Sequence, residues 1–269
     1  MMGGHHAASG AAAWIAIAST GPYALGWYPL DSTGILIGAM ATAGTALVVD
    51  WDHRHSTIAN SLPPLSNMIA VGIEKASGGH RQGTHSLLGA SAFVVLAAMA
   101  AQFQMVTPMG KLSVGAGLLC MFMINLAAKA LNLFPKSGWI TNWLFALVMA
   151  GLVTWFAPDQ WGWLPLSMLT GVVVHIVGDM ITVGGVPLLW PIVIKPPKFL
   201  RKSVISGIWR SNGAFSIPLL GRAGSRREWL VLIPVSGYAM VGMGAAAWTL
   251  AQQHWPGVLA ALGGVVQLP

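Results

Sequence analysis

Long apolar segments alternate with shorter polar ones along most of the chain. Seven segments approach or exceed the roughly 18–20 residues that a helix needs to cross a bilayer. They cover residues 7–26, 32–49, 86–106, 112–131, 140–157, 164–183 and 229–251. Gly21-Pro22 interrupts the first, so we expect that helix to be kinked or partly interfacial. The pattern predicts an all-α, polytopic transmembrane bundle of about seven helices, within a range of about six to eight.

The composition also favours a membrane protein. Hydrophobic residues make up 55% of the chain and charged residues only 8%, whereas a soluble domain carries roughly 25% charged residues. The single cysteine, Cys120, excludes an intrachain disulfide framework and a cysteine-rich zinc site. The N-terminus lacks the basic region of a signal peptide, so we expect the first apolar segment to remain in the mature protein.

The positive charge is distributed asymmetrically. With seven crossings, the N-terminus and the connections at 50–85, 132–139 and 184–228 share one face, which holds all of the 14 lysines and arginines except Lys111. Cytoplasmic loops of membrane proteins carry this excess of positive charge. We therefore expect a multi-pass protein of the inner (cytoplasmic) membrane with a cytoplasmic N-terminus.

Histidines and aspartates gather on the same face. In "VVHIVGDM", His175 and Asp179 are four positions apart, so one helix face presents both, about 6 Å apart along the axis. Ionisable residues inside a span are costly and usually face a functional cavity. The alternative is a polar pair that binds neighbouring helices.

A second cluster follows the second apolar segment. "VVDWDHRHS" supplies Asp50, Asp52, His53 and His55 within six positions. Mixed carboxylates and imidazoles suit zinc, manganese or iron, whereas magnesium and calcium prefer oxygen ligands alone. The alternative is a solvated loop or an aspartate helix cap, and His55 is the weakest candidate.

The third cluster is "GGHRQGTHSLLG", residues 78–89. In a continuous helix His80 and His85 would lie about 140° apart, but the glycines predict a loop in which both rings can turn inward. Thr84 or Ser86 can cap the next helix. Arg81 offers a planar cation suited to a phosphate oxygen. The alternative makes Arg81 a topological anchor and the histidines interfacial.

Other polar residues are weaker candidates. His5 or His6 can reach the same cavity, unless the N-terminus is disordered. Glu74 is a possible extra carboxylate, although its context favours a solvated turn. Asp31 and Asp159 fall on the opposite face and receive no role.

The motifs "DWDH", "GHRQGTHSLL" and "HIVGDMITVGGVPLLWP" resemble the YdjM-type family, named as membrane-bound, metal-dependent hydrolases. The resemblance covers roughly residues 1–195. Val48-Val49 stands where Leu-Pro is usual, and Gln82-Gly83 shifts a small residue by one place, but neither departure removes a candidate ligand. The motif order is also distantly similar to that of zinc-dependent phospholipase C and related single-strand nucleases. The resemblance implies functional positions at His6 (with His5 as an alternative), Asp50, Asp52, His53, His80, Arg81, Thr84, His85, His175 and Asp179.

These observations predict a three-part organisation: a hydrolase-like membrane domain (1–195), a basic cytoplasmic loop (196–228), and a C-terminal transmembrane helix with a tail (229–269). We expect a site at the cytoplasmic end that cuts a phosphoester of a lipid or lipid-linked substrate, using one to three divalent ions, with zinc preferred over manganese or iron. The basic loop would favour anionic membrane lipids. The expected metal ligands are His6, Asp50, Asp52, His53, His80, His85, His175 and Asp179.

Arg81 is expected to clamp phosphate, together with Thr84 and Ser86 as substrate contacts. Asp52 or Asp50 is expected to orient the attacking water. The rival reading is a non-catalytic metal-binding protein that ties helices together or recruits a partner. A transporter would need polar residues at the membrane midplane, which are almost absent. Nucleic acid is not an expected partner, because aromatic and basic residues do not interleave. The pattern leaves the oligomeric state open.

Overall fold

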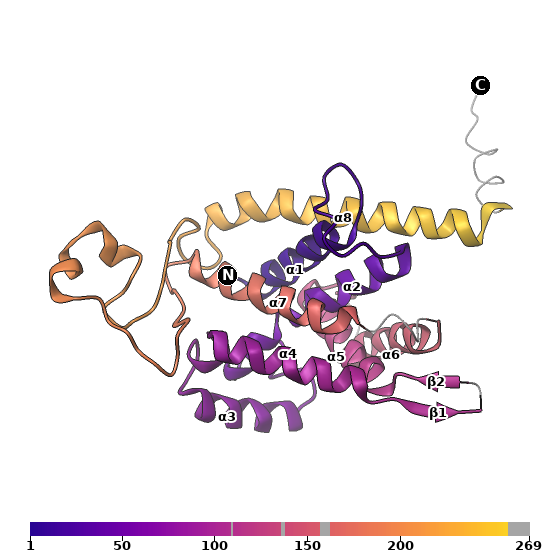
Figure 1. Ribbon diagram of the computed structural model, residues 1–269, viewed down its shortest axis with the longest axis horizontal. Helices are drawn as coiled ribbons and strands as arrows, with labels where there is room; N and C mark the ends of the chain where they lie inside the picture. The colour runs from indigo at the N-terminus through magenta and orange to yellow at the C-terminus, as the bar shows by residue number, and fades with distance from the viewer. Residues whose placement is uncertain (109, 136–137, 157–161, 258–269) are drawn as a thin grey trace.

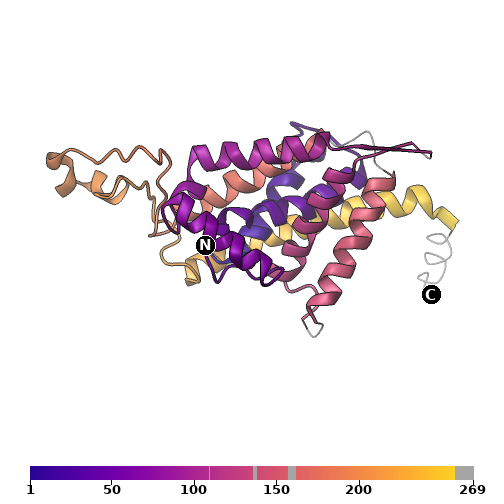
Figure 2. The same cartoon turned by 90° about the horizontal axis from the view of Figure 1, so that it is seen from below.

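A computed structural model describes residues 1–108, 110–135, 138–156 and 162–257 (Figures 1 and 2). Lys136 and Asp159 lie outside the described residues. The α-helices are α1 (Gly3–Ala18), α2 (Ser32–Thr45), α3 (Leu65–Ser77), α4 (Leu87–Gln102), α5 (Val114–Ala130), α6 (Trp139–Phe156), α7 (Trp163–Met180) and α8 (Arg226–His254). Short 3-10 helices are η1 (Val48–Asp52), η2 (Gly83–His85), η3 (Lys198–Lys202) and η4 (Val204–Gly207). An antiparallel hairpin of β1 (Met105–Thr107) and β2 (Gly110–Leu112) pairs Val106 with Lys111.

The centre of the bundle is built from small residues. α1 packs against α2, α7 and α8, and α2 also packs against α5 and α7. Figure 1 shows α8 running along one side of this group. The helices approach closely at glycines: a Cβ on Gly44 would overlap the backbone carbonyl of Met123, and one on Gly171 would overlap the Thr45 hydroxyl. Small residues at helix contacts are typical of membrane bundles, in which van der Waals packing holds the helices together.

The outer surface is apolar, as expected for a protein that has lipid as its solvent. Met99 on α4 and Leu230 on α8 are 65% and 72% exposed. Three segments of the described residues are long and apolar enough to cross a membrane: Ser32–Asp52, Trp163–Met180 and Arg226–His254. Shorter apolar helices cover Leu87–Gln102, Val114–Ala130 and Ile140–Thr154. Each of the seven predicted apolar segments contains an α-helix, and the number of crossings stays a prediction.

Several predicted boundaries were wrong. The first predicted segment, 7–26, ends as a helix at Ala18, before Gly21-Pro22. Its 16 residues correspond to about 24 Å, less than the roughly 30 Å hydrocarbon core. The segment predicted at 86–106 is helical only to Gln102, because residues 105–107 pair in the hairpin.

The two long connections contain short helices. In the basic loop, η3 and η4 follow Pro196-Pro197, and η4 ends at Gly207. This basic loop extends away from the helices (orange in Figure 1). In the connection 50–85, the structure forms α3, which the apolar pattern did not predict.

The close approach of α2 to α5 at Gly44 is testable. Gly44→Ala should destabilise the protein by about 1–3 kcal/mol, because the added methyl group must push the two backbones apart. The measurement is the melting temperature in detergent. The matched control is Gly151→Ala on α6, where a Cβ meets nothing within 4 Å; it should be neutral or slightly stabilising. Equal melting temperatures for the two variants would contradict this packing.

Candidate metal centre

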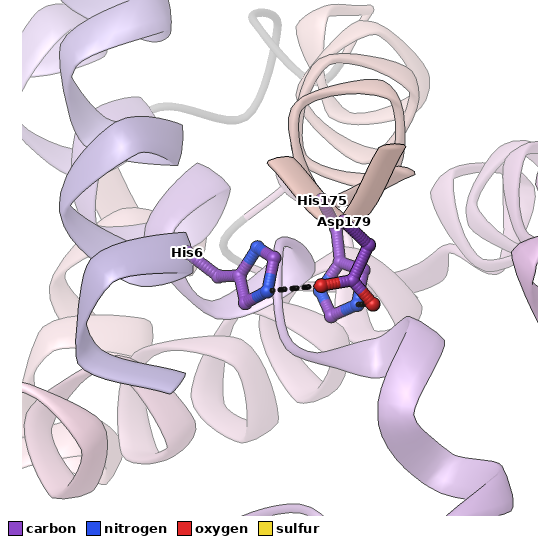
Figure 3. Close-up of side chains that lie close together, drawn as sticks. All are labelled: His6, His175 and Asp179. Atoms are coloured by element: carbon purple, nitrogen blue, oxygen red, sulfur yellow. Dashed lines mark ion pairs between the residues drawn. The ribbon is translucent and has the colours of Figure 1, made fainter. Parts of the chain in front are cut away.

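Four separate parts of the chain meet at one buried point. His6 comes from the first turns of α1, and Asp50 and Asp52 come from η1, directly after α2. His80 and His85 come from the loop that follows α3, and Asp179 lies one turn after His175 on α7. Figure 3 shows His6 directed from α1 toward the α7 pair. The structure thus brings together side chains that are up to 173 positions apart, since 179 − 6 = 173.

The geometry of four donor atoms suits a small metal ion. The Nε2 atoms of His85 and His175 are 3.3 Å apart. Asp50 Oδ1 lies 3.6 and 3.5 Å from these two nitrogens, and Asp179 Oδ2 lies 3.5 and 3.8 Å from them. A tetrahedral ion with bonds of about 2.0–2.2 Å places its ligand atoms roughly 3.3–3.6 Å apart. These five separations are therefore compatible with a divalent metal such as zinc bound by the two histidines together with Asp50 or Asp179.

The orientation of His175 is set by the backbone of α2. Its Nδ1 lies 2.6 Å from the Ala46 carbonyl oxygen, which can only accept a hydrogen bond. Nδ1 therefore carries the proton, and Nε2 presents its lone pair to the cluster. A ring nitrogen that donates to a carbonyl is the usual outer support of a metal-binding histidine.

The opposite side of Asp179 contacts the N-terminal helix. His6 Nε2 is 3.4 Å from Asp179 Oδ1, as drawn in Figure 3, and the His6 ring stacks on His175 at 3.7 Å. Arg81 Nη2 donates to Asp179 Oδ2 at 2.9 Å. Three groups of side chains have donor atoms close enough to share an ion. They are His6, His175 and Asp179; Asp50, His85 and His175; and Asp50, Asp52 and His80.

Asp52 organises the loop that carries the histidines. Its carboxylate is completely buried and accepts hydrogen bonds from the Arg81 backbone N–H at 2.9 Å and the Thr84 hydroxyl at 2.6 Å. His80 Nδ1 lies 3.0 Å from its other oxygen. Arg81 has a φ of 58°, an unfavourable value for a non-glycine residue. These contacts hold the Arg81 backbone against Asp52 while the guanidinium reaches Asp179.

The cluster attracts positive charge. Burial disfavours the protonated form of His85, but its acidic partners Asp179, Asp50 and Asp52 outweigh this and raise the pKa of His85 to about 10. These carboxylates therefore favour a cation at this point, whether a proton or a metal ion.

A cavity of about 280 Å³ opens beside the cluster. Its lining includes Asp50, His53, His80, Arg81 and Asp179. Partial burial, and then the neighbouring His80, lower the pKa of His53 below its ordinary value. Of the two carboxylates considered for orienting water, only Asp50 lines this cavity.

Some predicted residues lie outside the three donor groups. His53 and the exposed His55 line the cavity. Thr84 donates to Asp52, and Ser86 caps α4 by accepting from the Gly89 N–H at 3.1 Å. Thr84 and Ser86 are buried and do not line the cavity, so these hydrogen bonds support the loop and α4, and a role as substrate contacts stays a prediction. Glu74 pairs with Arg54 at 2.6 Å on the surface and belongs to none of the donor groups, but it lies in α3 rather than in the predicted turn.

The pattern analysis missed Glu228, and of its two N-terminal candidates His6, not the alternative His5, reaches the cluster. His5 does not point into the cluster; it pairs with the fully buried Glu228 at the start of α8. Glu228 also accepts from the Met2 N–H and the Gly224 N–H, both at 2.8 Å. One signal was available, because Glu228 is the only acidic residue after Asp179. This pair anchors α8 beside the helix that carries His6.

Fold and cluster together define a helical membrane protein with grouped histidine and aspartate side chains that can hold a metal ion. The chain belongs to the YdjM inner membrane protein family, whose model matches residues 1–132 and 140–264. This confirms the resemblance of the motifs and extends it beyond residue 195. Neither the curated proteins nor the solved structures contain a significant match.

The buried Glu228 should contribute strongly to stability. Glu228→Ala leaves His5 and two backbone N–H groups without their acceptor in a buried place, so we expect a loss of about 2–4 kcal/mol. Glu74→Ala removes an exposed pair and should cost roughly 0–1 kcal/mol. Thermal unfolding in detergent compares the two variants. Similar destabilisation by both would mean that the Glu228 contacts do not anchor α8.

Proposed function

We propose that this protein is a membrane-bound, metal-dependent hydrolase that cuts a phosphoester of a lipid or lipid-linked substrate. The observation that carries the proposal is the set of five separations of 3.3–3.8 Å among donor atoms of His85, His175, Asp50 and Asp179. These donors stand beside a cavity that also presents Arg81.

The donor set supports one or two ions, at the lower end of the one to three expected. His175 has only Nε2 available, because Nδ1 is bonded to Ala46. His175 can therefore bind an ion in only one of its two donor groups at a time. Asp50 has two oxygens and can serve a second ion together with Asp52 and His80. Mixed nitrogen and oxygen donors favour zinc, with manganese or iron as alternatives.

The residues around the cavity would have different chemical roles. A divalent metal supplies Lewis acidity and lowers the pKa of a bound water toward neutrality. With one ion bound, the second carboxylate oxygen of Asp50, on the cavity wall, would orient the attacking water. Arg81 uses one N–H on Asp179 and keeps other donors for a phosphate oxygen. Asp52 would position His80, Arg81 and His85 rather than contact the substrate.

The membrane setting supports an amphiphilic substrate. Asp50 and Asp52 lie at the end of one candidate span and Asp179 at the end of another, and we therefore propose that the cavity lies at a membrane boundary. The basic residues of 195–227 would favour anionic lipid. We further propose a multi-pass topology with about seven crossings and with the cluster on the cytoplasmic side, from the distribution of positive charge.

A structural metal site is the second candidate. One observation favours it: His6, His175 and Asp179 are each at most 1% exposed. An ion held by this group would tie α1 to α7 without access to substrate. The proposals differ over Asp50, which faces the cavity: the hydrolase requires it for turnover, whereas an ion held by His6, His175 and Asp179 does not require it.

Metal content tests the centre directly. Protein purified in detergent should contain one or two transition-metal ions per chain by elemental analysis, and His175→Ala should lose at least one, because a donor of two groups is gone. The matched control is His254→Ala, at the exposed end of α8. His85→Ala gives a second variant if His175→Ala does not fold. Wild-type protein without bound metal would contradict the proposal.

Turnover separates catalysis from a structural role. Zinc-loaded protein should release the headgroup of a phospholipid in mixed micelles. Asp50→Asn should lower kcat about 10²–10⁴-fold. Arg81→Lys should mainly raise KM, because a point charge replaces a bidentate donor. Glu74→Gln is the control at an exposed carboxylate. If Asp50→Asn keeps both metal and wild-type turnover, Asp50 does not orient the water.

A further inference from the structure

Helix α3 buries small residues and exposes large apolar ones. Ser66, Ala70 and Ser77 face the protein, whereas Leu65 and Met68 are 55% and 69% exposed. A helix on the surface of a soluble protein has the opposite arrangement, with its apolar stripe turned toward the core. The outward face of α3 therefore requires an apolar environment outside this chain.

The residues of α3 divide into three stripes. At about 100° per residue, Ser66, Ala70 and Ser77 occupy one stripe, and Leu65, Met68 and Ile69 the next. The third stripe is mainly polar. It carries the exposed Asn67 and Lys75 and also Glu74, which pairs with Arg54, and the half-buried Val71 lies between them. A helix at a membrane surface has this division, because it borders protein, lipid and water at once.

Hydrogen bonds hold α3 in this orientation. The Ser66 hydroxyl donates to the Ala59 carbonyl at 2.7 Å, and the Trp51 indole N–H lies 3.4 Å from the Ser66 carbonyl. Both contacts are on the buried stripe. Because this stripe is anchored to the segment that follows α2, the apolar stripe cannot turn inward without breaking them.

The position of α3 identifies what covers it. α3 contacts η1, which completes the candidate span Ser32–Asp52, so it lies at a membrane boundary. The start of α4 shares this boundary, and its Leu87 and Leu88 are also exposed. Lys75 adds a positive charge at the polar edge, where lipid headgroups carry phosphate.

We propose that α3 is an interfacial helix whose Leu65, Met68 and Ile69 insert among the lipids of the leaflet on the side of the metal cluster. Gly78, with a φ of 82°, ends the helix and turns the chain toward His80 and Arg81. The cavity beside these two residues then opens at the level of the lipid headgroups. The headgroup as substrate rests on the proposed function, but the insertion of α3 does not.

Site-directed fluorescence tests the insertion. A bimane label is attached to Met68→Cys or, as the matched control on the neighbouring polar stripe, to Asn67→Cys. The native Cys120 is fully buried, and intact mass verifies a single label. The proteins are placed in nanodiscs of phosphatidylcholine and phosphatidylglycerol that contain doxyl-labelled lipid. We expect doxyl lipid to quench the label at 68 at least about twofold more than the label at 67, and aqueous iodide to show the reverse order.

Two outcomes would overturn the proposal. Equal iodide quenching at both positions would place the apolar stripe in water. Protection of the label at 68 from both quenchers would mean that protein covers it, and self-quenching that grows with the number of chains per disc would identify a second copy. Ile69→Cys repeats the test if Met68→Cys does not fold. Metal content measured on the same samples separates this result from the proposed function, because the insertion requires no bound ion.

Discussion

The structure depends on the need to neutralise carboxylates buried among apolar helices. Asp52 and Asp179 are at most 1% exposed, and an uncompensated buried charge costs several kcal/mol. Lipid cannot supply the missing hydrogen bonds, so other parts of the chain must. Asp179 draws in Arg81 and His6, and Asp52 draws in the backbone of the loop after α3. The same demand for positive charge that assembles these segments also makes the cluster a good place for a metal cation.

Small residues make this assembly sterically possible. The cluster forms only if α2 and α7 approach closely enough for side chains as short as aspartate to meet. Gly171 against Thr45 allows that approach, and Gly44 against Met123 lets α5 pack closely on α2. The Ala46 carbonyl, which orients His175, belongs to the same contact between α2 and α7. The close packing of α2 against α7 and the orientation of His175 therefore depend on the same contact.

The polar residues fall into two kinds according to what they face. Asp50 and Arg81 reach the cavity, whereas Asp52, Thr84 and Ser86 bond within the protein and hold the loop in place. The Glu228 pair with His5 is a second buried polar contact, and it connects α8 to the first turn of α1. A side chain that lines the cavity can contact a substrate, whereas one that is bonded within the protein can only hold other side chains in place. Residue type does not make this distinction.

The sequence by itself determined the seven apolar helical segments and the few polar residues that are candidates for the cluster. Apolar length marks the helices, and only 7 acidic residues occur in the chain, so clusters containing them stand out. Only the tertiary structure decided that His6 rather than His5 joins the cluster, that Asp50 rather than Asp52 faces the cavity, and that α3 forms with its apolar stripe outward. Neighbouring residues of one type look equivalent in a local pattern. Their side-chain directions follow from loop dihedrals and from contacts between helices distant in sequence, which local spacing does not encode.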